Sequence, residues 1–156
     1  EKHTMAFSVA LSAQDNIILW GRTITDTADG DIAAITFPND LFSVKTGKGG
    51  NSLFARNESG RQAELTLRVL RGSGDDKFLQ TKFLLDEFLP ANIVLCFGSA
   101  SKKVAHGNGT YTNDTYLLQG GVLARPVEMK ANVEGDTEQA VSVYTIRFAN
   151  HVRTVA

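Results

Sequence analysis

Apolar and polar residues alternate along 62–69, and this pattern restricts what the chain can fold into more than any other feature. The stretch reads QAELTLRV, with an apolar residue at every second position. Successive side chains of a β-strand point to opposite faces, so a period of two predicts a strand with one buried face and one polar face. It is the clearest strand signal in the sequence.

Weaker versions of the same pattern predict further strands, and turn residues separate them. The predicted strands cover 7–11, 17–24, 32–37, 93–97, 110–118 and 140–148. Asp15-Asn16 predicts a hairpin between the first two, and Gly107-Asn108-Gly109 predicts another between 93–97 and 110–118. The fold class that follows is mainly β: a β-sandwich or distorted barrel with one flanking α-helix and a long extended loop.

The one predicted helix covers 73–89. Ser73 precedes Asp76 by three residues, which is an N-cap pattern, and Asp75 and Asp76 fall at the positive end of the helix dipole. Pro90 ends the segment. Its apolar residues surround most of the helix, which is more than packing on one side needs: Phe78, Leu79, Phe83, Leu84, Leu85, Phe88 and Leu89. Either part of this surface meets another molecule, or the sheet and a loop of the same domain cover it.

The length and charge of the chain limit its size class and its partners. At 156 residues and 16.9 kDa, the chain fits a single domain over 1–156. The formal net charge is −1, so there is no basic excess to neutralise the phosphates of a nucleic acid. A near-neutral or acidic surface would instead let DNA pass without binding it.

The cysteine content and the hydropathy pattern indicate folding in a reducing cytoplasm. Cys96 is the only cysteine, within the apolar stretch IVLCF, so it is expected to be buried and no disulfide can form within the chain. No apolar run approaches the roughly 20 residues of a membrane span, so we expect no membrane anchor. The N-terminus has no signal-peptide core, and we expect Met5 to be the natural start, preceded by residues 1–4.

The segment 39–60 contains the glycine-rich stretch KTGKGGNS at 45–52, which invites comparison with a phosphate-binding loop. Such a loop needs a glycine, four residues and then Gly-Lys followed by Ser or Thr, between a strand and a helix. Here Gly49 follows Gly47-Lys48, Phe42 occupies the place of the first glycine, and no helical pattern follows. The spacing therefore favours a mobile glycine-rich loop.

The whole of 39–60 is expected to be a long irregular loop that finds a partner. Its apolar residues follow no consistent period: Leu41, Phe42, Val44, Leu53 and Phe54. A structureless loop of this length is uncommon in a compact domain unless it has a function or a partner. Its aromatic side chains need burial somewhere.

The sequence offers no pattern typical of a catalytic or metal site, so we expect neither an enzyme nor a cofactor. The three histidines, His3, His106 and His151, lack the spacing of metal ligands. A Ser-x-x-Lys box and a Lys-Thr-Gly box occur, but in the reverse of the order seen in penicillin-recognising enzymes and without the Ser-Asp-Asn element. The aspartates at 26, 29 and 31 do not form an EF-hand loop, because Ala28 interrupts the alternation.

Five stretches follow one another in an order that is informative as a whole. They are Asp29-Gly-Asp31, the glycine-rich loop 45–52, FARNESG at 54–60, ELTLRVL at 64–70 and SGDDKFL at 73–79. This arrangement of loop, strand and capped helix resembles the tail tube proteins of contractile-tailed bacteriophages, which are in turn similar to the tube protein of type VI secretion systems. No residue in it is diagnostic alone.

The resemblance implies a structural virion protein. Six subunits would form a ring, their sheets would join into a continuous barrel around a lumen, and stacked rings would form the inner tail tube through which DNA reaches the host. The resemblance also implies tail sheath, baseplate and tail terminator proteins as partners. The location would be the virion tail, with assembly in the host cytoplasm.

In the resemblance, the loop 39–60 corresponds to an extended arm that packs on a neighbouring subunit or ring. Phe42, Phe54 and Arg56 would anchor it, because aromatic residues and arginine dominate the energetics of interfaces. The residues expected at the subunit or ring interface are Phe42, Lys45, Lys48, Asn51, Phe54, Arg56 and Asn57.

Glu64, Thr66 and Arg68 form the polar face of the strand predicted over 63–69 and are a candidate lumen face, although ordinary solvent exposure explains them equally well. Lys45 and Lys48 depart from the family, since a strongly acidic lumen could not include them without compensation. Exposed strand edges invite pairing with other chains, and only three prolines are present to blunt them. Ring closure would satisfy such edges.

Two other functions remain open on the sequence. A type VI secretion tube component would share the architecture. A monomeric β-sandwich that binds a small ligand or carbohydrate would instead stay a single species in solution and carry a concave pocket.

Overall fold

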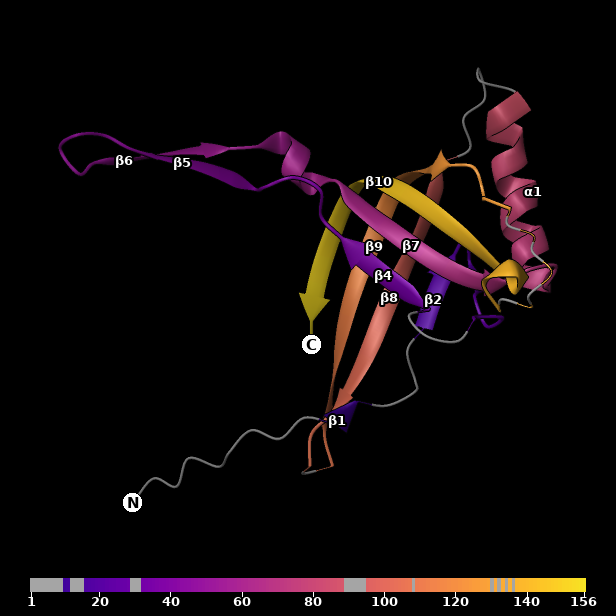
Figure 1. The fold of residues 1–156 in the computed structure, drawn as a ribbon. Coiled ribbons are helices and arrows are strands. Elements are labelled where there is room, and N and C mark those ends of the chain that lie inside the picture. Colours follow the sequence, from indigo (N-terminus) through magenta and orange to yellow (C-terminus); the bar gives the residue numbers. More distant parts are fainter. Residues whose placement is uncertain are drawn as a thin grey trace.

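The structure is a computed structural model, and it describes residues 10–11, 16–28, 32–88, 95–107, 109–129, 131, 133, 135 and 137–156. Ten strands, one α-helix and two 3₁₀ helices make up this part of the chain (Figure 1). The strands are β1 (Ala10–Leu11), β2 (Asn16–Leu19), β3 (Arg22–Thr23), β4 (Ala33–Thr36), β5 (Phe42–Thr46), β6 (Ser52–Arg56), β7 (Ala63–Leu70), β8 (Cys96–Ala105), β9 (Tyr111–Arg125) and β10 (Val141–Val155). The helices are η1 (Glu58–Arg61), α1 (Gly74–Phe88) and η2 (Thr137–Ala140). The prediction of a mainly β fold with one α-helix is confirmed.

Eight of the described strands form one antiparallel sheet in the order β3-β2-β8-β9-β10-β7-β4, and β1 pairs with β8 beside this path. β5 and β6 form a separate two-stranded sheet. The large sheet curls back on itself. Phe37, directly after the edge strand β4, has its ring centroid 4.6 Å from that of His151 on β10 and 6.4 Å from that of Tyr116 on β9. This curl is the distorted-barrel character expected from the sequence.

The first strands pair differently from the sequence prediction. The segment 17–24 is not one strand, because Trp20 and Gly21 have φ angles of 50° and 78° and reverse the chain between β2 and β3. Two positive φ angles are what a tight two-residue hairpin turn requires. The predicted hairpin between 7–11 and 17–24 is also wrong, since β1 and β2 both pair with β8. Residues 7–9 of the predicted first strand and Asp15 of the predicted turn lie outside the described residues.

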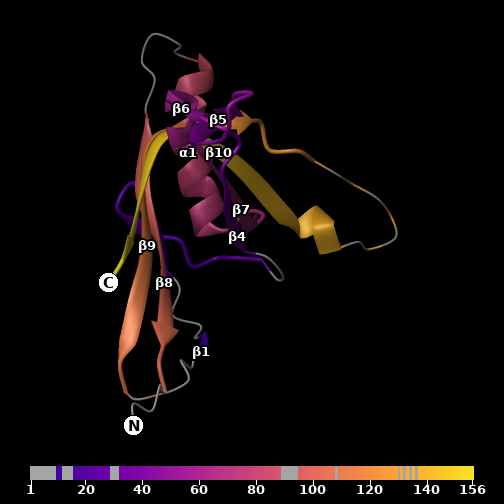
Figure 2. The same cartoon turned by 90° about the vertical axis from the view of Figure 1, so that its left-hand side faces the viewer.

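β9 and β10 are longer than predicted and form the spine of the sheet. β10 pairs with β7 along Val141 to Phe148 and with β9 from Thr145 to Val155, with a register shift between Thr145 and Ile146. Figure 2 shows the resulting bend, which separates the first half of β10 from β9 and lays the second half along it. The hydrophobic pattern marks only the buried half, so the sequence ends the strand too early.

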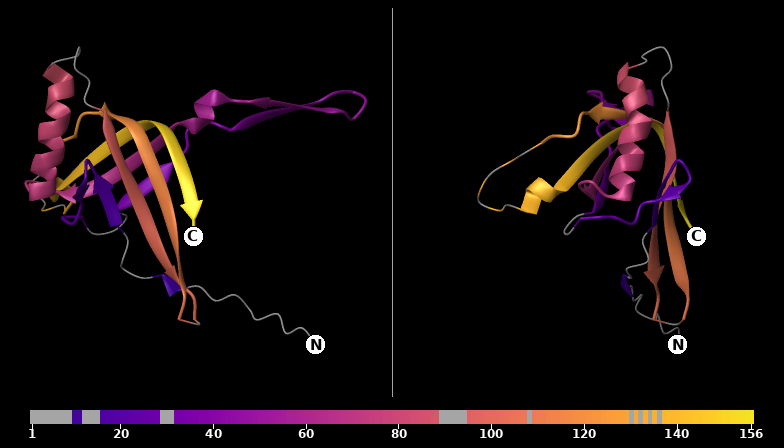
Figure 3. Two further views of the ribbon diagram at one scale, coloured as in Figure 1. Left: turned by 180° about the vertical axis from the view of Figure 1, so that it is seen from behind. Right: turned by 90° about the vertical axis from the view of Figure 1, so that its right-hand side faces the viewer.

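The core lies on one face of the sheet, and α1 covers it at one end (Figure 3). Leu65 and Leu67 of β7 face Ile146 and Tyr144 of β10 in register, and all four are fully buried. The remaining core residues are Ile17, Leu19, Ile24, Ala63, Val69, Leu79, Phe83, Cys96, Leu118 and Phe148. The buried position of Cys96 is as predicted.

α1 begins as predicted, with the backbone N–H of Asp76 donating to Ser73 Oγ at 3.3 Å. Leu79 and Phe83 are buried against the sheet, and the Phe83 ring lies 5.0 Å from the ring of Trp20. Leu84 is exposed. The side chains of Leu85, Phe88 and Leu89 lie outside the described residues. For the described side chains, the sheet therefore covers one face of the helix and solvent meets the other.

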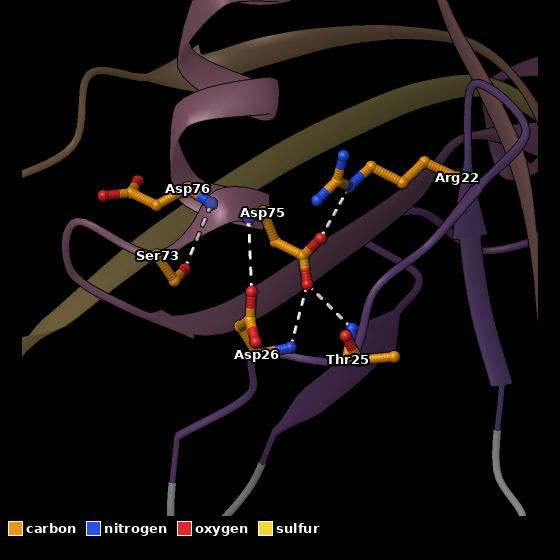
Figure 4. Close-up of polar contacts among 6 residues, drawn as sticks. All are labelled: Arg22, Thr25, Asp26, Ser73, Asp75 and Asp76. Atoms are coloured by element: carbon orange, nitrogen blue, oxygen red, sulfur yellow. Dashed lines mark hydrogen bonds and ion pairs between the residues drawn. The ribbon is translucent and has the colours of Figure 1, made fainter.

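A buried carboxylate fixes the start of α1 to the β3 region (Figure 4). Asp75 is fully buried and accepts hydrogen bonds from Arg22 Nε at 2.7 Å and from the backbone N–H groups of Thr25 and Asp26 at 2.7 and 2.8 Å. Burial alone would raise the pKa of this carboxyl, but the bonds from Asp26, Arg22 and Thr25 outweigh burial and hold the pKa below its usual 3.8. Asp75 is thus a structural anion, and not only a partner of the helix dipole.

Candidate assembly interface

The segment between β4 and β7 is a β-hairpin that projects from the body, and not an irregular loop (Figure 1). We call residues 42–56, which comprise β5, its turn and β6, the arm. Five residue pairs join the two strands, from Phe42 opposite Arg56 to Thr46 opposite Ser52. Every residue of both strands is exposed to solvent. The prediction of an irregular segment is therefore wrong, because cross-strand hydrogen bonds organise it.

The glycine-rich stretch forms the tip of the arm. Gly47 N–H donates to the Asn51 carbonyl at 2.8 Å, and Gly50 N–H donates to the Gly47 carbonyl at 3.0 Å. Gly50 has a φ of 83°, which a side chain would strain. These glycines close a hairpin between two strands, in place of the strand and helix that flank a phosphate-binding loop.

The register of the arm gives its two faces different chemistry. Side chains of directly opposed residues share a face, and the face changes at every residue. Phe42, Val44, Phe54 and Arg56 therefore lie on one face, which we call the apolar face of the arm. Its three apolar side chains are 55%, 58% and 67% exposed, in that order. Ser43, Lys45, Leu53 and Ala55 lie on the opposite face.

Hydrogen bonds tie the two chain segments at the base of the arm to each other. Asn57 N–H donates to the Leu41 carbonyl at 2.7 Å, and the Asn57 side chain accepts from Ser59 Oγ at 2.7 Å. Asn39 Nδ2 donates to the Ser59 carbonyl at 3.2 Å. A Cβ on Gly60 would stand 2.7 Å from the Asp40 carbonyl oxygen, so the two chain segments meet here as closely as glycine allows. The two strands of the arm are therefore joined at their base as well as along their length.

The structure distributes the predicted interface residues over three parts of the arm. Phe42, Phe54 and Arg56 share the apolar face, and Lys45 lies on the other face. Lys48 and Asn51 belong to the tip. Asn57 lies directly after the arm, where its N–H donates to the Leu41 carbonyl and its side chain caps η1.

Sequence reasoning did not include Val44 among the interface residues, although it lies directly opposite Phe54. The signal that could have found it is the pair of short alternating stretches FSV and FAR on either side of a glycine-containing turn, which is typical of a hairpin.

The candidate lumen residues occupy the face of β7 opposite to the core. Glu64, Thr66 and Arg68 alternate with the buried residues of the strand and are themselves half-buried. Arg147 of β10 donates from Nη2 to Glu64 Oε2 at 3.0 Å. Part of this polar surface is therefore already neutralised within the chain.

The open strand edges within the described part of the chain include β4 and the second half of β10. β4 ends the strand order, with β7 on one side only. Beyond Phe148, β10 pairs with β9 on one side while β7 has already diverged. Val152 and Val155 on this stretch are 51% and 55% exposed. Unpaired backbone groups beside exposed β-branched residues are a template for another strand.

The remaining findings concern metal sites, membrane spans and relatives. Among the described residues, no group of three or more His, Cys, Asp and Glu side chains could hold a metal ion. None of the helices in the described ranges has the length and hydropathy needed to cross a bilayer. No protein-family model matches the sequence, and no curated protein matches it.

Proposed function

We propose that this chain is the structural subunit of a bacteriophage tail tube, which assembles through its arm into stacked rings, six subunits being the number expected from the resemblance. The observation that carries the proposal is the apolar face of the arm. Phe42, Val44 and Phe54 lie on one face of the arm and remain more than half exposed. Large exposed apolar surfaces of this kind mark sites of protein association.

The open strand edges support the same proposal independently. An exposed edge is a liability for a soluble monomer, and pairing between subunits removes it. In a closed ring, the edges at β4 and at the second half of β10 would meet partners from neighbouring copies. DNA would pass through such a ring without specific binding, in keeping with the net charge of −1. Sheath, baseplate and terminator proteins would be the other partners.

Electron microscopy of negatively stained, purified protein tests the proposal. We expect rings or stacked rings from the native chain. Phe54→Ala removes a large anchor from the apolar face, so it should shorten the tubes or abolish them while the thermal unfolding temperature stays the same. Leu53→Ala is the matched control, because Leu53 is 65% exposed on the opposite face of the arm. Tubes of unchanged length with Phe54→Ala would contradict the role of the arm.

A type VI secretion tube component would form the same rings, so the location of the protein distinguishes it from a tail tube subunit. A tail tube subunit copurifies with intact virions, whereas a secretion tube component appears in culture medium of cells that carry no phage. A monomeric β-sandwich that binds a small ligand or carbohydrate would appear in the same micrographs as monomers, without rings.

A further inference from the structure

The inside of the curled sheet is filled by large side chains where α1 packs on it. Phe83 of the helix stacks on Tyr144 of β10, with ring centroids 6.3 Å apart, and both side chains are fully buried. Two alanines face the same interior from other strands. Ala100 of β8 lies opposite Ile17 of β2, and Ala33 of β4 lies opposite Leu67 of β7. Opposed residues share a face of the sheet, and small side chains there leave space that large ones would fill.

A pocket of about 290 Å³ occupies this space, between strands from the two ends of the sheet (Figure 1). Ile17 of β2 lines it from one end of the strand order, and Ala33 and Ile35 of β4 line it from the other. Ala100 and Tyr116 lie between them. In the described part of the chain, no ladder joins β4 to β2 or β3, so the curl is not closed here.

The size of this space suits a small molecule. The interior of an eight-stranded barrel is just wide enough to be filled by side chains or to hold one small ligand. Ligand pockets in proteins begin at about 300 Å³, and they combine a mainly apolar lining with a few polar groups that orient the ligand. The large sheet has eight strands, and side chains fill only part of its interior.

The pocket also carries a local positive charge. Lys102 of β8 and Asp114 of β9 lie opposite each other, and both line the pocket. Arg153 donates from Nε and Nη2 to the two carboxylate oxygens of Asp114, each at 2.9 Å, so this carboxylate is already paired. Lys102 forms no ion pair with any carboxylate of the described residues. Two cations and one carboxylate leave a net charge of +1, which attracts an anion.

We propose that the open interior of the sheet is a binding site for a small anion with an apolar body, such as an aromatic or aliphatic carboxylate. The apolar body would pack on Ile17, Ile35 and Ala100, and the carboxylate would face Lys102. Burial of the body supplies affinity, and the lysine selects the charge. The arm contributes no residue to this site, so the site goes beyond the proposed function.

Two fluorescent probes with closely similar rings test the site. Anilinonaphthalene sulfonate carries a sulfonate that stands in for the carboxylate, whereas phenylnaphthylamine has no charge. Each probe is titrated into the native chain at a concentration where the chain is monomeric. We expect both to bind, and the anionic probe to bind about threefold to fivefold more tightly, because an exposed charge pair contributes modestly.

Two substitutions separate the apolar body of the site from its charge. Ala100→Phe fills the pocket and should weaken the binding of both probes at least about tenfold. Lys102→Gln should weaken only the anionic probe, by about threefold to fivefold. Lys103→Gln is the matched control, because the next residue points to the opposite face of β8, where its Nζ lies 3.9 Å from the centroid of the Tyr111 ring. It should change neither affinity.

Thermal unfolding shows that each variant is folded, and Ala33→Leu is the second filling variant should Ala100→Phe not fold. If the native chain binds neither probe, the inference is overturned. Undiminished binding to a folded filling variant would place the probes elsewhere, for example on the apolar face of the arm, and would overturn it as well. Equal effects of Lys102→Gln and Lys103→Gln would contradict the anion preference.

The outcomes also separate this inference from the proposed function. Rings in electron micrographs without probe binding would leave the proposed function standing and remove the ligand site. Probe binding that follows the expected pattern, in a chain that stays monomeric at every concentration, would support the site and overturn the proposed function.

Discussion

At the residue scale, Asp75 is the side chain on which the junction between α1 and the β3 region most depends. It is fully buried, and Arg22 and two backbone N–H groups satisfy its charge. Removing one partner of a buried ion pair leaves the other without compensation. Asp75→Asn should lower the free energy of unfolding by about 2–3 kcal/mol, below the usual loss for a fully buried pair because Arg22 is 45% exposed.

Chemical denaturation measures this effect, and Asp114→Asn is the matched control. Asp114 also accepts from an arginine, with Arg153 Nη2 at 2.9 Å, but this pair lies at the surface and should contribute less to stability than the Asp75 pair. Equal losses in the two variants would show that burial does not strengthen the Asp75 pair.

The lowered pKa of Asp75 also predicts a pH dependence. In the unfolded chain the carboxyl takes up a proton near its usual pKa of 3.8, whereas in the folded chain it stays ionised to lower pH. Its contribution is therefore fully present above about pH 4 and is lost as the pH falls through the folded pKa. The native chain should lose stability more steeply than Asp75→Asn below about pH 4 in denaturation series. Parallel curves would contradict this assignment.

The sequence predicts the local interactions of this cluster but not the long-range ones. The cap formed by Ser73 and Asp76 spans three positions, so the sequence predicted it. Asp75 and Arg22 are 53 positions apart, and only the folded sheet brings them together. No local pattern could have paired them.

At the element scale, the arm is distinctive because every residue of its two strands is exposed to solvent. An isolated two-stranded ribbon is marginally stable in water, so the amides of β5 and β6 should exchange hydrogen rapidly in the monomer. On assembly, we expect their exchange to slow by at least about tenfold, because docking covers the apolar face. Exchange in β7, which is central in both states, should not change.

Hydrogen exchange followed by mass spectrometry, on monomer and assembled fractions, makes this comparison. If the amides of β5 and β6 exchange equally fast in the monomer and in the assembled fraction, the subunits associate without the arm. Slow exchange of the arm already in the monomer would mean that the ribbon is stable without a partner.

The elements of the sheet were predictable where one face is buried and the other is not. β7 alternates cleanly, and the predicted strand 63–69 matches it within one residue. β5 and β6 escaped detection because adjacent apolar residues, Leu41 with Phe42 and Leu53 with Phe54, break the period. The pairing of β1 and β2 with β8 was missed because the proximity of two short strands in sequence favoured a hairpin.

At the scale of the whole molecule, surface chemistry is polarised along one direction. A cationic arm with an apolar face projects from one end, and α1 and the start of β10 lie at the other (Figure 1). The open strand edges of β4 and of the second half of β10 are further sites for pairing with other copies. Such a molecule satisfies its exposed surfaces by contact with copies of itself, and head-to-tail contacts close into rings only when the rotation between copies allows it.

Sedimentation velocity of the native chain over a wide range of concentrations tests this central claim most directly. The account predicts that species much larger than the 16.9 kDa chain form and grow with concentration, as expected when each copy offers both an apolar arm and open strand edges. A single 16.9 kDa species from the most dilute to the most concentrated sample would contradict it.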